Sequence, residues 1–449
     1  MRAKQNAPGS QEDRFAAYIE SLAQAAGHAD REEPIKSYCK GLLLPGERKS
    51  VEPMAARLAP DNVRQTHQSL HHIVADSPWD DDVMLGRIRE SVLPAMERKG
   101  EAEAWIIDDT GFAKKGTHSV GVARQYCGQL GKQDNCRVAV SLSVATATSS
   151  LPVTWRLYLP ETWAKDRHRR KKAGVPSGIA FETKPQIALA QIRKAFEDGV
   201  SPAPVLADAG YGNDSGFRKG ITGLGLNYMV GVQSSTTVWK PGEGPLQAKP
   251  PVGGKGRPAT LLRRDKNHQP VSVKQLALSL EPGAWTKVSW REGSAGKMRS
   301  RFAALLVRPA HRDESRSQPH PEEWLLIEWP QSEAEPLKYW LSTLPENLSL
   351  KRLVYIAKHR WIIERDYQEL KQELGLGHYE GRGWRGFHHH ATLCIAAYGF
   401  LVAERTLFSP SARGGSLQLS VPTIPKSFRP RGSRPARAPQ PSLHRYAAH

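Results

Sequence analysis

The sequence predicts an α/β protein built on a mixed β-sheet flanked by helices. Between residues 104 and 232, strand-like and helix-like segments follow one another in the order β-β-β-α-β-α-β, an order that favours a mixed sheet. Apolar residues at three- and four-residue spacing on both sides of this region predict further helices. The chain has 449 residues, enough for two or three domains, and its 39% hydrophobic and 24% charged residues are typical of a globular protein.

The first 98 residues are expected to form a helical domain, because apolar side chains recur there at helical spacing, as in Phe15, Ile19 and Leu22. Residues 99–232 contain the strand-like segments. These are AWIID (104–108), RVAVSLSVATAT (137–148), VTWRLYLP (153–160), PVLAD (204–208) and LNYMVGV (226–232), with an amphipathic helix at 181–196 between the third and the fourth.

The composition of the sequence changes after residue 232. Residues 233–345 are expected to form an inserted, mainly β subdomain, since glycine- and proline-rich stretches alternate there with short apolar runs. Residues 346–408 carry a long helical pattern at 350–374 and a second at 387–407. The 41 residues from 409 to 449 hold seven prolines, seven basic and no acidic residues, a composition expected to stay disordered.

Charge and cysteine usage narrow the class of protein. The formal net charge is +19, and it is spread over the chain after residue 98, which favours a polyanionic partner; residues 1–98 carry 13 basic and 15 acidic groups. No uninterrupted apolar run reaches the roughly 20 residues of a membrane helix, and none follows the charges at the N-terminus as a secretory signal would require. The chain is therefore expected to have no membrane partner. Four scattered cysteines predict reduced thiols and a cytoplasmic protein.

Carboxylates follow two of the predicted strands. Asp108 and Asp109 end AWIIDD, and Asp208 ends PVLAD. Because the carboxyl ends of neighbouring parallel strands meet at one edge of an open α/β sheet, these acids can converge and share a cation. A structural role in turns is the alternative for each of them alone. Successive side chains of a strand point to opposite faces, so Asp108 and Asp109 cannot both serve one site while the strand continues.

A third carboxylate lies in the helical pattern HRWIIERDYQELKQELGLGHYEGRGWRGFHHH (359–390). Arg360, Glu364 and Lys371 share one stripe of the predicted helix, a pattern more often typical of a solvated face. If Glu364 instead faces the aspartates, three carboxylates can hold two divalent cations, and Arg360 and Lys371 lie where DNA phosphates would pass.

The segments IIDDTGFAKKG, VLADAGYGND and the helix from residue 359 together resemble the insertion-sequence transposases of the DDE class. The resemblance covers about residues 100–405. It implies an RNase H-like core formed by residues 99–232 and 346–408, with a β-rich insertion before the last acid. Asp109, Asp208 and Glu364 match the three catalytic positions, with Asp-Thr at 109–110 favouring Asp109 over Asp108. Arg360 and Lys371 match the basic positions of the family's helix.

The resemblance also implies a chemistry. Two Mg²⁺ ions, which Mn²⁺ can replace, are expected on Asp109, Asp208 and Glu364, where they support cleavage of double-stranded DNA at the ends of an insertion sequence and transfer of the freed 3′-OH into target DNA. A homodimer on DNA follows from the need to cut two ends together, and localisation at the bacterial nucleoid follows from the substrate. By position alone, residues 1–98 resemble a domain that recognises transposon ends.

Two further motifs, a basic run and a histidine run, could take part in binding, and two other functions compete with that of a transposase. The basic run KDRHRRKK (165–172) is expected in a loop that contacts the DNA backbone or is simply solvated, through Arg167, Arg169, Arg170, Lys171 and Lys172. The run His388-His389-His390 cannot place all three rings on one ion if it is helical. A DNA-binding protein on a transposase scaffold that no longer cuts is the first alternative function, and a two-carboxylate hydrolase is the second.

Overall fold

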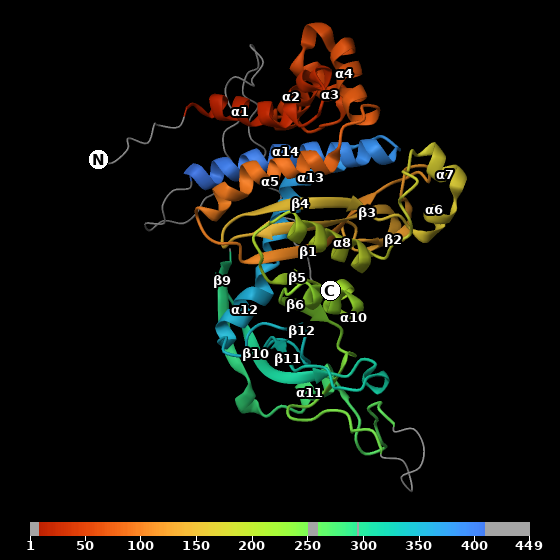
Figure 1. Cartoon of the computed structure of the whole chain (residues 1–449). Helices are drawn as coiled ribbons and strands as arrows, with labels where there is room; N and C mark the ends of the chain where they lie inside the picture. Colours follow the sequence, from red (N-terminus) through yellow and green to blue (C-terminus); the bar gives the residue numbers. More distant parts are fainter. Residues whose placement is uncertain (1–8, 250–258, 294–295, 409–449) are drawn as a thin grey trace.

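The computed structural model describes residues 9–249, 259–293 and 296–408 (Figure 1). The predicted disordered segment 409–449 lies outside the described residues. The helices are α1 (Gln11–Gln24), α2 (Ala29–Leu43), α3 (Val51–Leu58), α4 (Val63–Ala75), α5 (Asp81–Glu97), α6 (Glu161–Lys165), α7 (Arg167–Lys172), α8 (Lys184–Glu197), α9 (Ala209–Gly212), α10 (Ser215–Gly223), α11 (Val273–Leu278), α12 (Leu350–His359), α13 (Ile362–Gln372) and α14 (Trp384–Phe408).

The strands are β1 (Ala104–Ala113), β2 (Ala123–Cys127), β3 (Lys132–Ala145), β4 (Ser150–Leu157), β5 (Val205–Ala207), β6 (Tyr228–Val232), β7 (Thr237–Trp239), β8 (Val271–Ser272), β9 (Thr286–Gly293), β10 (Gly296–Pro309), β11 (Glu323–Trp329) and β12 (Lys338–Ser342). The predicted order of strands and helices between residues 104 and 232 is present, with additional short elements.

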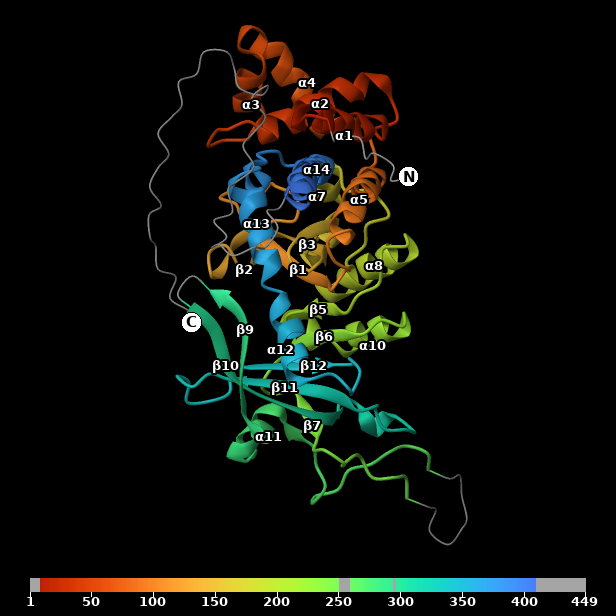
Figure 2. The ribbon, with the colours of Figure 1, turned by 90° about the vertical axis from the view of Figure 1, so that its left-hand side faces the viewer.

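The centre of the sheet has the order β4-β3-β1-β5-β6. β1 pairs antiparallel with β3, which pairs antiparallel with β4, while β5 pairs parallel with both β1 and β6. The α8–α10 segment covers one face, and α5, α13 and α14 cover the other (Figures 1 and 2). This is a mixed sheet between two layers of helices, and the predicted RNase H-like α/β fold is confirmed.

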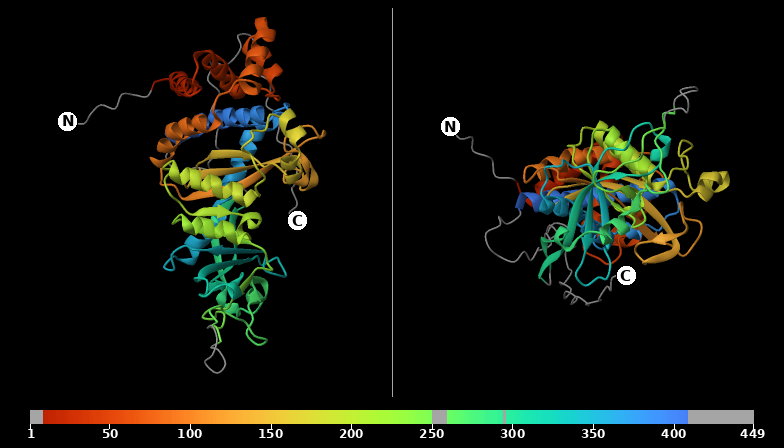
Figure 3. Two further views of the ribbon diagram at one scale, coloured as in Figure 1. Left: turned by 45° about the vertical axis from the view of Figure 1, so that its right-hand side comes forward. Right: turned by 90° about the horizontal axis from the view of Figure 1, so that it is seen from below.

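The region 233–345, which the sequence predicted as an inserted, mainly β subdomain, carries β7–β12 and continues the sheet of the core. Its last strand, β12, pairs antiparallel with β6, so that β12, β11, β10, β7 and β8 extend the central sheet in that order. The open edge of β6 explains this continuation, since an apolar strand such as β12 satisfies that edge's backbone groups. The insertion and the core therefore share one twelve-stranded sheet, drawn out along one direction (Figure 3).

The helical pattern at 350–374 is two helices and not one, which corrects the prediction of one long helix. α12 ends at His359 and α13 begins at Ile362. Neighbouring side chains at the break are held in different directions: the His359 ring bonds the Thr146 carbonyl at 2.9 Å, Arg360 reaches the aspartates of the sheet, and the Arg291 guanidinium lies 3.6 Å from the centroid of the Trp361 ring. A kink is thus fixed beside the carboxylates.

α5 and α14 lie together over the sheet, while α1–α4 stack on the far side of α14 (Figure 1). Arg89 of α5 donates to the Val153 carbonyl of β4 at 3.0 Å, and Tyr18 of α1 donates to the Ala396 carbonyl at 2.8 Å. α14 is long and apolar enough to cross a membrane by length and composition, but most of it is buried in the protein. It is the core helix that joins the N-terminal helices to the sheet.

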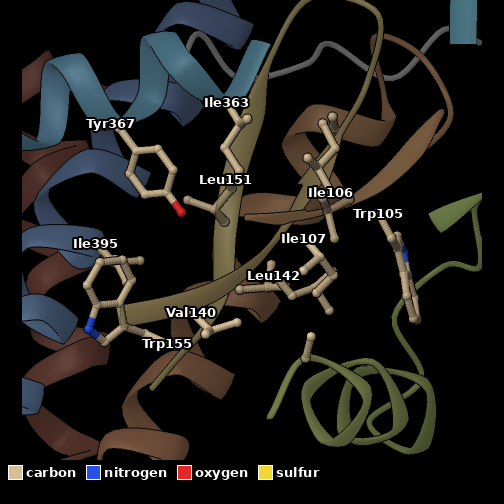
Figure 4. Close-up of a cluster of buried hydrophobic side chains, with 14 of the residues drawn as sticks. Trp105, Ile106, Ile107, Val140, Leu142, Leu151, Trp155, Ile363, Tyr367 and Ile395 are labelled. Carbon is tan, nitrogen blue, oxygen red and sulfur yellow. The ribbon is translucent and has the colours of Figure 1, made fainter. Parts of the chain in front are cut away.

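The main core lies between the sheet and this helical layer. Figure 4 shows Ile363 and Tyr367 of α13 and Ile395 of α14 with side chains of β1, β3 and β4. Ile363 and Ile395 are fully buried. The Tyr367 hydroxyl lies 2.5 Å from the Ser141 hydroxyl of β3, so one polar contact fixes α13 over the middle of the sheet.

Candidate active site

Two of the predicted aspartates lie side by side at one edge of the core. β1 and β5 are parallel, with Trp105 opposite Val205 and Ile106 opposite Leu206. Continuing this register brings Asp108 next to Asp208. β1 itself runs on to Ala113 in its pairing with β3, so Asp108 and Asp109 lie within the strand and do not end it as the sequence suggested. Only the pairing with β5 ends before them, and this leaves the two aspartates free of a neighbouring strand on that side.

Arg360 joins Asp108 and Asp208. Its guanidinium lies 3.4 Å from a carboxylate oxygen of Asp108 and 3.6 Å from one of Asp208. Asp208 also caps α9, because its other oxygen accepts from the Gly210 amide at 2.8 Å. The break between α12 and α13 places Arg360 here, between two carboxylates of the sheet.

Asp109 points to the opposite face. In the pairing of β1 with β3, Asp108 is opposite Ser141 and Asp109 is opposite Val140. Ser141 contacts α13, whereas Asp109 accepts from the Lys184 ammonium of α8 at 2.6 Å and from the Tyr211 hydroxyl of α9 at 3.2 Å. Asp108 therefore faces the side that carries α13, and Asp109 faces α8.

Glu364 lies in the first turn of α13, one turn after Arg360, and is exposed. Its charge acts on the Arg360 guanidinium, as do those of Asp108 and Asp208. Within the part of the chain that the structure describes, no three His, Cys, Asp or Glu side chains are grouped closely enough to hold a metal ion. The structure thus joins two carboxylates through Arg360 and leaves the third on the adjoining helix, facing solvent.

Lys371 does not extend into solvent. Its ammonium donates to the Gly111 carbonyl of β1 at 3.1 Å and lies 5.1 Å from the centroid of the Phe112 ring. Burial lowers the pKa of Lys371. The predicted stripe of Arg360, Glu364 and Lys371 therefore faces β1 at both of its basic positions, and Lys371 ties α13 to β1.

The electrostatics of Asp108 are unusual for an aspartate. Burial raises the pKa of the Asp108 carboxyl to about 7; the nearby Arg360 guanidinium opposes this shift, and the charges of Asp109 and Asp208 add to it. A half-exposed Asp208 beside it completes a patch of like charge. Strongly shifted carboxyl groups at the edge of a sheet are typical of functional sites.

The basic run at 165–172 is helical, where the sequence predicted a loop. Arg167, Lys171 and Lys172 of α7 are exposed. Arg169 and Arg170 are partly buried and serve the local fold, since Arg169 stacks 3.8 Å from the centroid of the Trp163 ring and donates to the Thr117 carbonyl, and Arg170 donates to the carbonyls of residues 164 and 176. Three of the five side chains of this run that were predicted to bind DNA are exposed to solvent.

The three histidines of α14 each bond a different part of the fold. His388 accepts from the Leu157 amide of β4 at 3.1 Å, His389 bonds Asp81 at 2.9 Å, and His390 bonds the Tyr38 hydroxyl at 2.8 Å. Their rings point to three different elements, so no ion is shared.

Two residues of the site were not found from the sequence. Lys184 is the first residue of α8, Tyr211 lies in α9, the helix directly after Asp208, and both contact Asp109. Lys184 is far from Asp109 along the chain and part of no charge run. The tyrosine of ADAGYG gave a usable signal, since it directly follows the aspartate turn.

The chain has known relatives. Residues 21–297 match the DDE superfamily endonuclease family. This match covers more than half of the chain, which therefore belongs to the DDE superfamily of endonucleases, and the resemblance stated from the sequence is confirmed. The matched residues include Asp108, Asp109 and Asp208 and end before Arg360 and Glu364.

A curated relative points to a narrower group. The probable transposase for insertion sequence element IS701 of Microchaete diplosiphon is 33% identical to this chain over 204 residues, which are 45% of this chain and 49% of the relative. The chain thus spans about half the length of the curated relative it matches.

Proposed function

We propose that this protein is a DNA transposase that cleaves double-stranded DNA at the ends of an insertion sequence and joins the freed 3′-OH to target DNA, with a divalent metal. The observation that carries the proposal is the meeting of Asp108 and Asp208 just past the parallel pairing of β1 with β5, next to a helix that has Glu364 in its first turn. Membership of the DDE endonucleases supports the same chemistry.

Asp108, Asp208 and Glu364 are the proposed metal ligands, with Asp108 in place of the Asp109 expected from the sequence. The face of β1 supports this change, because Asp108 shares its side of the sheet with α13 while Asp109 is engaged by Lys184 and Tyr211. Carboxylate oxygens are hard donors that suit Mg²⁺ or Mn²⁺, and a patch of acids with a raised carboxyl pKa fits a cation.

Two bound ions would activate the attacking oxygen and stabilise the leaving 3′ oxygen. The residues of the chain prepare the site for them. Arg360 offsets the repulsion between Asp108 and Asp208, and its guanidinium can turn to a DNA phosphate, for which its planar donors are suited. Tyr211 and Lys184 hold Asp109, and so fix the strand on which Asp108 lies. Lys371 anchors α13 over the same strand.

The proposed reaction needs only water, the DNA end and the target DNA. Water attacks the phosphorus and the P–O3′ bond breaks, which leaves a 5′-phosphate and a 3′-OH; that hydroxyl then attacks a target phosphodiester in a second in-line displacement. Two ends have to be cut together, so we also propose a homodimer on DNA. The exposed cations of α7 are proposed to contact the DNA backbone, and the protein to act in the cytoplasm at the nucleoid.

Cleavage of a supercoiled plasmid that carries the ends of the element tests the proposal. The native chain should cut at the ends with Mg²⁺ and not with EDTA, and Glu364→Ala should bind the same DNA without cutting it. Glu369→Ala, on the same helix, is the matched control. DNA binding without cutting by the native chain in Mg²⁺ or Mn²⁺ would contradict the proposal and favour a DNA-binding protein that has lost catalysis.

A further inference from the structure

A cleft of about 620 Å³ lies between the N-terminal helices and the catalytic core. One wall comes from α3, α4 and the segment before α3, and the other from the end of α7 and from the segment 378–386 that joins α13 to α14. Figure 1 shows α3 and α4 above α14, with α7 beside one end of α14. No residue of the proposed active site lines this cleft.

The side chains at its walls are mainly cationic. Arg48, Lys172, Arg382 and Arg385 line the cleft and are exposed, against Glu52 and Glu380. His67 and His71 add two further nitrogen-bearing rings from α4. The charge is not a property of the whole N-terminal region, since residues 1–98 have more acidic than basic groups. Cations are gathered where this region meets the core.

Two of these cations have little to bind within the protein. Among the described residues, Arg382 and Lys172 make no side-chain hydrogen bond or ion pair. Arg48 pairs with Glu380 at 2.8 Å, but both side chains are about 70% exposed, so water weakens the pair. By contrast, the buried Lys49 donates to the Leu42 and Leu44 carbonyls and supports the wall itself.

The walls are held in place by hydrogen bonds between distant segments. The Lys49 amide donates to the His378 ring at 3.0 Å, and Arg385 donates to the Asp76 carbonyl at 2.8 Å. The floor is tied to the catalytic strand, because Lys114, which directly follows β1, donates to the Tyr379 carbonyl at 2.9 Å. A ligand in the cleft therefore has a fixed position relative to β1.

Gly381 and Gly386 make room for the ring of Tyr379 at this floor. A Cβ atom at either glycine would collide with the Tyr379 hydroxyl. The Tyr379 ring stacks on that of His390 at 5.6 Å, with an interplanar angle of 24°. The sequence EGRGWRG thus combines small residues that admit an aromatic ring with two arginines at the rim, and the proposed active site uses none of them.

We propose that this cleft binds the sugar–phosphate backbone of one strand of the DNA substrate, outside the position that is cut. Cavities of this size accommodate roughly one drug-sized ligand, comparable to one or two nucleotides, and not the width of a duplex. The planar guanidinium of Arg382 and the ammonium of Lys172, both without a side-chain partner among the described residues, suit phosphate. The inference deepens the proposed function and rests on it: the N-terminal helices contribute to DNA binding as one wall of a composite cleft.

The salt dependence of DNA binding tests the inference. The probe is a 40-base-pair fluorescent duplex that carries one end of the element, and binding to the full-length chain is measured in EDTA so that no cleavage interferes. Arg48→Gln/Arg382→Gln should lower the slope of log K against log salt by about 1.8, since each lost phosphate contact removes about 0.9. The loss should be the same for a duplex of scrambled sequence.

Arg193→Gln/Lys219→Gln is the matched control, because both residues are exposed on α8 and α10, away from the cleft. It should leave the slope unchanged. A thermal melt checks that the cleft variant is folded, and Arg382→Glu alone should weaken binding further than Arg382→Gln. An unchanged slope in a folded cleft variant, with normal binding by the native chain, would overturn the cleft alone. Failure of the native chain to bind the duplex would overturn the proposed function as well.

Discussion

Two regions of this protein gather side chains that commonly bind metals, and their surroundings differ. In α14 each of the three histidines has its own partners: His388 bonds β4, His389 bonds Asp81 and the Ser77 carbonyl, and His390 bonds Tyr38 and the Gly375 carbonyl. At the edge of the sheet, two neighbouring carboxylates share one guanidinium at 3.4 and 3.6 Å.

The two regions differ in how completely their polar side chains are paired within the protein, and this difference indicates which region is functional. Polar groups whose bonds are all made within the protein stabilise the fold, whereas like charges left partly unpaired at a sheet edge cost stability and are retained at functional sites. Residue type alone does not separate the two regions, because histidines and aspartates are both common metal ligands. The hydrogen bonds and ion pairs of the folded chain distinguish the histidines from the aspartates.

The largest expected effect comes from replacing the carboxylates at the sheet edge. Asp208→Asn and Glu364→Gln should each lower the rate of Mg²⁺-dependent cleavage by more than about 10³-fold, because each removes a charged ligand from the reacting centre. DNA binding in EDTA should stay within a few-fold of native. The rates are measured by single-turnover cleavage of end-bearing plasmid, and a variant that cuts within tenfold of the native rate would remove its residue from the ligand set.

A smaller effect is expected on the other side of β1. Asp109→Asn should lower the cleavage rate by about 10- to 100-fold, the range found when a residue that orients a ligand is changed. The variant loses the charge that holds Lys184, and the Tyr211 hydroxyl keeps an acceptor. Tyr211→Phe should have a similar or smaller effect in the same assay. A loss as complete as that of Asp208→Asn would show that Asp109 is itself a ligand.

The histidine region should respond to pH through stability. Burial lowers the pKa of His390 to about 4, below the value near 6.5 that it has in an unfolded chain. The unfolded state therefore binds the proton more readily, and the stability that neutral His390 provides is complete above pH 6.5 and lost as the pH falls towards 4. This amounts to about 3 kcal/mol, which denaturant unfolding at a series of pH values measures.

His390→Gln is the comparison variant for that experiment. It removes the titrating group, so its stability should fall less steeply between pH 6.5 and 4 than that of the native chain. Equal slopes for the two proteins would contradict the role assigned to His390. Cleavage of DNA at pH 8 should persist in this variant, since no residue of the proposed active site contacts His390.

The smallest effect concerns Arg360. In the native chain Arg360 offsets the repulsion of Asp108 and Asp208, so added Mg²⁺ has to compete with it. Arg360→Gln should therefore melt at a lower temperature in EDTA and gain more from Mg²⁺ than the native chain does, by about 2 °C or more. A thermal melt with and without Mg²⁺ gives both values. An equal gain in the two proteins would mean that Arg360 and the metal do not share the carboxylates.

Much of the core could be predicted from the sequence. The strand segments predicted the mixed sheet, and the acids that follow their apolar runs indicated the sheet edge where Asp108 and Asp208 meet, because apolar runs and turns are local signals. Contacts between distant segments could not be predicted from the sequence. The insertion joins the core sheet because β12 meets the open edge of β6, and no local pattern reports strand pairing between distant segments.

The choice between Asp108 and Asp109 shows the same limit. Side-chain alternation said that only one of them could face the site, but which face carries α13 depends on the register of β1 with β3 and on the contact between Ser141 and Tyr367. Lys184 could not be found for the same reason, since its contact with Asp109 spans 75 residues of chain.

The most direct test compares these two neighbours. End-bearing supercoiled plasmid is incubated with Mg²⁺ and the native chain, Asp108→Asn or Asp109→Asn, with EDTA as the blank. We expect Asp108→Asn to bind the ends without cutting them, and Asp109→Asn to cut them still, at a reduced rate. Cutting by Asp108→Asn together with complete loss in Asp109→Asn would contradict this expectation and place the metal on the opposite face of β1.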